Sequence, residues 1–91
     1  MSHTTREKTK LLNRVRRIRG QMEAVERALQ EEKSCADVLQ LIAGARGAIN
    51  GLMAEVVEDH IQLHVADHAL DQKQRNEGAA ELIDVMRAYL K

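Results

Sequence analysis

The chain has 91 residues, with no Pro, Phe or Trp, one Tyr, one Cys and a formal net charge of zero at pH 7. This length allows one domain over residues 1–91, and the single Cys35 excludes a disulfide framework. A core without large aromatic side chains is thin, so we expect a homo-oligomer. Because no apolar run approaches a membrane span and no signal segment is visible, we expect a cytoplasmic protein with a reduced thiol and no membrane partner.

Charge is distributed unevenly along this neutral chain. Residues 6–19 carry seven basic residues against the single Glu7, a net charge of +6. Residues 55–84 carry eight acidic residues against Lys73 and Arg75, a net charge of −6. Such asymmetry favours a nucleic-acid surface at the basic end of the chain.

Apolar spacing predicts a first helix over residues 5–32. Its apolar residues recur at intervals of four and three, as in a coiled-coil seam, at Leu11, Val15, Ile18, Met22, Val25 and Leu29. Basic residues flank this seam on both sides, at Arg6, Lys10, Arg14 and Arg17 and at Lys8, Arg16 and Arg19. Charged flanks are ordinarily solvated surface, but this density exceeds what solubility needs and favours contacts with duplex phosphates. The lack of aromatics disfavours single-strand stacking, and no helix-turn-helix pattern is present.

A second helix is predicted over residues 35–65, with Ser34 as its N-cap. It carries two adjacent apolar rows. One row consists of Val38, Ile42, Ala45, Ile49, Leu52, Val56 and Leu63, and the other includes Leu41, Ala48 and the glycines. Two rows require two partners, which we expect to be the first helix and another subunit.

Residues 67–78 are polar and are expected to form a linker that ends at Gly78. A short third helix is predicted over residues 79–90. Its apolar face comprises Ala79, Leu82, Ile83, Met86 and Leu90. No strand-like alternation is found, so the predicted fold class is all-α.

One thiol and two imidazoles lie at opposite ends of the second helix. Cys35 and His60 are separated by about 37 Å at the helical rise of 1.5 Å per residue. They form one site only if a second copy runs antiparallel, which brings Cys35 of one chain to His60 and His64 of the other. Small residues near the expected two-fold axis, at Gly44, Ala45, Gly47, Ala48 and Gly51, would let the two backbones approach.

The spacing of His60 and His64 places both imidazoles on one helix face, an arrangement that can hold a metal ion. One thiolate with several imidazoles suits Ni, Co or Zn. His3 and the Ser2 amine, if Met1 is removed, are further candidate ligands. Taken separately, a His pair near a helix end is more often an exposed surface feature than a pair of metal ligands. A lone buried Cys likewise more often behaves as a small apolar residue than as a ligand.

An enzyme is not expected, because a nucleophilic Cys35 has no orienting third group or oxyanion donor set around it. A metal-buffering bundle that binds no DNA is a further alternative, which would show no shift of its own promoter DNA.

The chain resembles the CsoR/RcnR family of copper-, nickel/cobalt- and formaldehyde-sensing bacterial repressors. The matching segments are RVRRIRGQ (14–21), Cys35 with VLQLIAGARGAINGLMAEV (38–56), His60 and the terminal RAYLK. The resemblance implies a three-helix protomer, an antiparallel dimer that assembles into a flat tetramer, and DNA binding without a helix-turn-helix. It also implies that the ligand-free protein represses a metal efflux or detoxification operon and that ligand binding releases it from double-stranded operator DNA.

Within this family the ligand depends on individual positions. Copper sensors have a second Cys where this chain has His64, and formaldehyde sensors use an N-terminal Pro amine with the Cys and usually lack the second His. Nickel/cobalt sensors use the N-terminal amine with residues that match His3, Cys35, His60 and His64, which favours Ni(II) or Co(II). A formaldehyde-responsive repressor that uses Cys35 and the N-terminal amine is the alternative. By the same resemblance, the DNA contacts are Lys10, Arg14, Arg17 and Arg46, the last being the only basic residue of the second helix besides its histidines.

Overall fold

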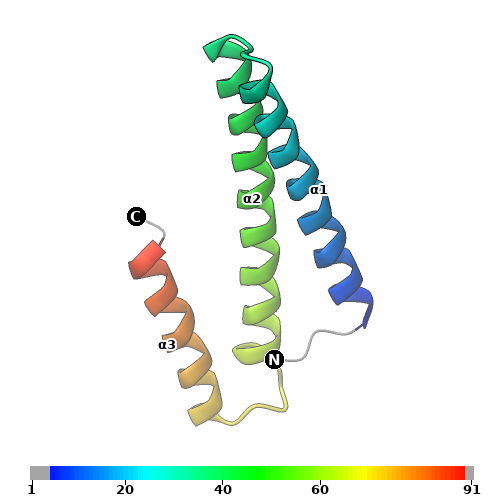
Figure 1. The fold of residues 1–91 in the computed structure, drawn as a ribbon. Helices are drawn as coiled ribbons and strands as arrows, with labels where there is room; N and C mark the ends of the chain where they lie inside the picture. Colours follow the sequence, from blue (N-terminus) through cyan, green and yellow to red (C-terminus); the bar gives the residue numbers. More distant parts are fainter. Residues whose placement is uncertain (1–4, 90–91) are drawn as a thin grey trace. The chain divides into compact units, whose positions relative to one another are not determined.

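The computed structural model describes residues 5–89, with side chains from residue 7 onward, and over this range the chain forms three helices and no strand (Figure 1). α1 covers Thr5–Gln30, α2 covers Cys35–His64 and α3 covers Gln72–Tyr89. The predicted all-α class is confirmed. The chain divides into two compact units, an N-terminal unit of α1 with α2 as far as Met53 and a C-terminal unit from Ala54 onward. A single domain over residues 1–91 stays a prediction.

In the N-terminal unit, α1 runs antiparallel to α2 and lies alongside it (Figure 1). Val25 and Ala28 of α1 and Ala45 of α2 are its buried apolar residues, with Ala45 only 2 % exposed. Small side chains at a helix crossing shorten the distance between the two helix axes. The small residues expected between two copies are therefore used, in part, within one chain.

The glycines of α2 separate into two groups. A Cβ added at Gly51 would lie 3.1 Å from Nη1 of Arg14 on α1. A Cβ added at Gly44 or Gly47 would meet no atom within 4 Å. At 100° per residue, Gly44 lies on the opposite side of α2 from Cys35. The expectation that all of these small residues gather between two copies is therefore wrong in its detail.

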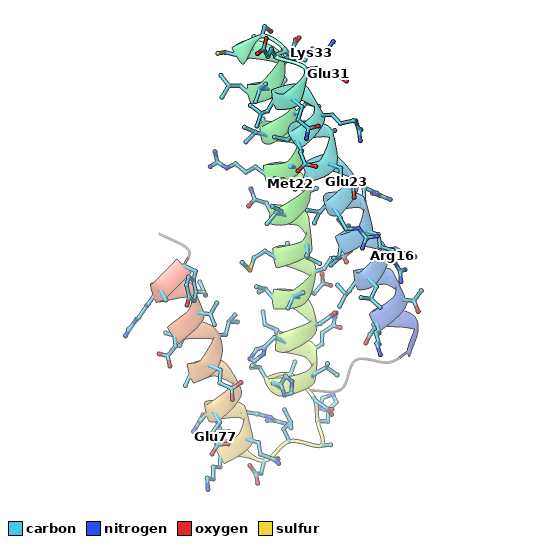
Figure 2. The ribbon with its side chains drawn as sticks, in the orientation of Figure 1. Arg16, Met22, Glu23, Glu31, Lys33 and Glu77 are labelled. Carbon is cyan, nitrogen blue, oxygen red and sulfur yellow. The ribbon has the colours of Figure 1, made fainter. Side chains whose placement is uncertain are left out.

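The turn between α1 and α2 is closed by hydrogen bonds on both sides. The amide of Lys33 donates to the carbonyl of Ala28 (2.9 Å) and that of Glu32 to Leu29 (3.2 Å), the two bonds of a Schellman C-cap. Glu32 takes the left-handed conformation, with φ of 54°. Ser34 then caps α2, since its Oγ accepts a bond of 3.1 Å from the amide of Asp37. Figure 2 labels Glu31 and Lys33 at this turn.

Both helices of the N-terminal unit keep an apolar row that α1–α2 packing leaves exposed. On α1 these residues are Val15, Met22 and Leu29, whereas Leu11 and Ile18 are half-buried. On α2, Ala45 is buried and Val38, Ala48 and Leu52 are half-buried. The exposed large apolar residues of α2 within this unit are Leu39, Leu41, Ile42, Ile49 and Met53. Two apolar rows on α2 were predicted, but their members are distributed differently from the prediction.

In the C-terminal unit, α3 begins at Gln72, seven residues earlier than the predicted 79. Asp71 and Gln74 form a reciprocal capping box: the Gln74 amide donates to Asp71 Oδ1 (2.8 Å), and the Asp71 amide donates to Gln74 Oε1 (2.9 Å). The prediction of a linker as far as Gly78 is therefore wrong. Polar residues extend α3 by two turns because its cap supplies the partners of the first amides.

Gly78 is buried inside α3 and allows α3 to lie against the end of α2. A Cβ at this position would overlap the carbonyl oxygen of His64 and would lie 2.8 Å from its carbonyl carbon. Gly78 therefore acts as a close-approach glycine rather than as a helix stop. It brings α3 to the turn that carries the two candidate histidine ligands.

Candidate functional site

His60 and His64 lie together in the last turns of α2. Their ring centroids are 4.9 Å apart, with the ring planes tilted by 44°. Both residues are half-buried. The spacing of four residues therefore brings the two imidazoles side by side on one helix face, as the sequence predicts.

The orientation of His60 is set by α3. Its Nε2 lies 2.8 Å from the carbonyl oxygen of Gly78 and 3.9 Å from Oε2 of Glu81. Because a carbonyl can only accept, Nε2 is the donor, and the lone pair available to a metal in the neutral form of the ring is on Nδ1. Glu81 is too distant for a hydrogen bond, so the Gly78 carbonyl holds the ring and Glu81 adds a negative charge nearby. Histidines that bind metals commonly donate their second N–H to such a partner.

Cys35 is exposed and is the first residue of α2, in the N-terminal unit. His60 and His64 belong to the C-terminal unit. Within the part of the chain that the structure describes, no group of three or more His, Cys, Asp or Glu side chains gathers to hold a metal ion. His3 and Ser2, the other predicted ligands, lie outside the described residues. The structure thus pairs two of the five predicted ligands.

The predicted DNA-binding residues differ in their exposure. Lys10 and Arg17 are exposed on α1, and Arg46 is exposed on α2. Arg14 is half-buried, and its guanidinium lies beside the backbone of Gly51. The exposed Arg16 donates from Nη1 to Oδ1 of Asn13 (3.0 Å) and is labelled in Figure 2. The described basic residues of α1 are therefore exposed, except for Arg14, which packs against α2.

Three residues of these sites were not predicted from sequence in the roles that the structure gives them: Gly51, Gly78 and Glu81. Gly78 and Glu81 meet His60 only because two helices are folded together, and no local spacing indicates that contact. The polar composition predicts a linker that ends at Gly78, although Asp71 and Gln74 carry the spacing of a helix start. The sequence places Gly51 at a contact between copies.

Over the described residues, no helix combines the length and the apolar character that crossing a bilayer requires. The chain matches the family model of metal-sensitive transcriptional repressors over residues 7–88. It is 52 % identical over its full length to an uncharacterized protein in the bioA 5′ region of Serratia marcescens, and covers all of that protein. It is 44 % identical, again over the full length of both chains, to the transcriptional repressor RcnR of Salmonella paratyphi B.

Two solved structures share the fold, each with a TM-score of 0.89. One is a variant of the formaldehyde-responsive regulator FrmR from Salmonella enterica serovar Typhimurium with one Glu replaced by His; it is 46 % identical, and the match covers 97 % of this chain and 99 % of that one. The other is the copper-sensing repressor CsoR with Cu(I) from Geobacillus thermodenitrificans; it is 25 % identical, and the match covers 100 % of this chain and 94 % of that one. The protein therefore belongs to the CsoR/RcnR family of metal-sensitive transcriptional repressors.

Proposed function

We propose that this repressor binds double-stranded operator DNA when it is ligand-free and is released by Ni(II) or Co(II). Release would derepress a metal efflux or detoxification operon. Because a repressor acts where its operator lies, the proposal places the protein in the bacterial cytoplasm. The observation that carries the proposal is the register of one face of α2.

That face combines the candidate ligands with the exposed apolar row. The residues of this face, from Cys35 to His60, follow one another at intervals of 4-3-4-3-4-3-4 residues. Between these two ends lie Leu39, Ile42, Arg46, Ile49, Met53 and Val56. Alternating fours and threes mark a helix-packing seam. Leu39, Ile42, Ile49, Met53 and Val56 are all exposed in the single chain.

These intervals are symmetric about their midpoint, which lies between residues 47 and 48. A second α2 that runs antiparallel through this point sets Cys35 against His60 of the second copy, and Leu39 against Val56. The same copy thus covers the apolar row and completes the ligand set. This is the basis for proposing an antiparallel dimer, and two such dimers would form the family's flat tetramer.

The proposed metal ligands are Cys35 of one chain with His60 and His64 of the other. They are joined by His3 and the Ser2 amine if Met1 is removed. The fit rests on the paired imidazoles and on Nδ1 of His60, which the bond to Gly78 leaves free. One thiolate among nitrogen donors suits borderline divalent ions, so Zn(II) remains a further candidate.

Lys10, Arg14, Arg17 and Arg46 are the proposed DNA contacts. The net charge of +6 over residues 6–19 supplies the attraction to phosphate. Because binding releases counterions from the DNA, added salt weakens this binding. For release, the metal must favour the state that binds DNA less tightly. We assign this to His3: when it joins the site, it draws the start of α1 toward the end of α2 and shifts the basic flank. His3→Ala would then bind DNA but no longer respond to the metal.

A formaldehyde-responsive repressor is the second candidate. It is favoured by the 46 % identity to a variant of a formaldehyde-responsive regulator and by the exposed thiol of Cys35. Aldehyde chemistry at Cys35 and the N-terminal amine would not require His64. His64 is therefore the residue that separates the two candidates.

A mobility-shift assay with DNA from upstream of the gene tests the proposal. The complex is titrated separately with Ni(II), Co(II), Zn(II) and Cu(I), and with formaldehyde in the presence of a chelator. Release by Ni(II) or Co(II) at the lowest concentration supports the proposal. Release by formaldehyde with chelator present would support the second candidate, and failure to shift this DNA would reject a repressor of its own promoter.

A further inference from the structure

Arg14 is distinguished from the other basic residues of α1 by its packing. Of the basic side chains described on this helix, it alone is half-buried, while the others are exposed. Its Nη1 would lie 3.1 Å from a Cβ at Gly51, so the guanidinium rests over the bare backbone of α2. Arg14 is also engaged in a further polar or electrostatic interaction. The end of this long side chain is therefore held in place rather than solvated freely.

Gly51 is equally distinct among the glycines of α2. Gly44 and Gly47 have open space where a Cβ would stand, whereas Gly51 has the Arg14 guanidinium there. Glycine weakens a helix interior relative to alanine, so a glycine with a close neighbour is best explained by the space that it leaves. That space is filled by one of the proposed DNA contacts.

We infer that Gly51 is a positioning residue for DNA binding, because the space left by its missing side chain holds the guanidinium of Arg14 against α2. The inference rests on the proposed function, in which Arg14 contacts phosphate. An Arg that is already held loses less side-chain freedom when it pairs with a phosphate. The contact between Gly51 and Arg14 also couples a DNA contact on α1 to α2, which is the helix that carries Cys35 and the two histidines. A shift of α2 along α1 would move Gly51 and therefore Arg14.

Graded substitution at Gly51 tests this role. Gly51→Ala requires the guanidinium to move by a few tenths of an ångström, and Gly51→Leu displaces it altogether. Gly44→Leu is the matched control, because it adds the same side chain to the same helix where no atom lies within 4 Å. Dissociation constants for the upstream DNA are measured over a range of salt concentrations, with helix content and oligomeric state checked for each variant.

We expect Arg14→Ala to weaken DNA binding roughly 10-fold and to lower the salt slope by about one for each copy in contact with DNA. Gly51→Leu should reproduce both effects, Gly51→Ala should show a smaller loss, and Gly44→Leu should bind like the wild type. A purely structural role for Gly51 would leave the salt slope unchanged.

A double-mutant cycle decides whether Gly51 acts through Arg14. In an Arg14→Ala background, Gly51→Ala and Gly51→Leu should cause no further loss of DNA affinity. Additive losses would overturn the inference, as would wild-type binding by Gly51→Leu. If Gly51→Leu misfolds, the cycle with Gly51→Ala gives the decision. Wild-type protein that fails to bind this DNA would overturn the proposed function as well, whereas an additive cycle overturns the inference alone.

Discussion

The imidazole of His60 donates from Nε2 to the carbonyl oxygen of Gly78, 2.8 Å away and 18 residues further along the chain. This bond links the end of α2 to α3 at Gly78, where an added Cβ would overlap the backbone of α2. It fixes the ring and leaves Nδ1 as the atom that a metal would take. The position of α3 and the geometry of the candidate ligand are thereby connected.

Gly78→Ala should therefore destabilise the protein and also disturb the proposed metal site. The added Cβ would overlap the carbonyl oxygen of His64, a backbone atom that cannot move aside as a side-chain end can. Overpacking of this kind costs about 1–3 kcal/mol. The free energy of unfolding from urea titration measures the first effect, and Ni(II) affinity measures the second.

Gly44→Ala is the control for that substitution. It adds the same methyl group to a helix where no atom lies within 4 Å, and should raise stability by up to about 1 kcal/mol. Equal stability changes for the two variants would show that α3 does not rest on Gly78 in solution.

His64→Leu should reduce Ni(II) and Co(II) affinity by at least about 100-fold, because loss of an outer partner alone costs about 10- to 100-fold. DNA binding in the absence of metal should persist, since none of the proposed DNA contacts lies in the last turns of α2. His68→Leu, at an exposed position after α2, is the matched control and should leave metal affinity unchanged. Unaltered affinity in His64→Leu would remove His64 from the site and favour the formaldehyde response.

Glu32→Gly should stabilise the protein by roughly 0.5–1 kcal/mol. Glu32 has a φ of 54°, a conformation that is unfavourable for residues with a Cβ and open to glycine. Urea denaturation measures the gain. Glu31→Gly, one residue earlier, is the control and should bring no gain, because Glu32 is the only non-glycine residue with positive φ over residues 5–89. A loss in Glu32→Gly would mean that its side chain contributes more than the backbone strain costs.

The bounds of the first two helices were close to predictable because their signals are local. Seam periodicity located α1 and α2, and Ser34 marked the start of α2 by a side chain that caps the amide three residues on. The start of α3 differs from the prediction, because the composition of a polar segment with a glycine indicates a linker rather than a helix. Asp71 and Gln74 carried the correct signal.

Contacts between helices were less accessible from the sequence. His60 and His64 could be paired because four residues separate them on one helix. The Gly78 carbonyl and Gly51 could not be assigned, because their partners, His60 and Arg14, lie on other helices at large sequence separations. The small residues of α2 illustrate the same limit: Ala45 packs on α1, and periodicity alone does not name the partner.

Ni(II) titration of mixed oligomers tests most directly whether the site is shared between two antiparallel copies. Chains with Cys35→Ala and chains with His60→Ala should each lose high-affinity Ni(II) binding. Refolded together, they should regain about a quarter of the wild-type sites, since random pairing makes half the dimers mixed and each mixed dimer carries one intact site of two. No recovery on mixing, or full binding by either variant alone, would contradict the shared site.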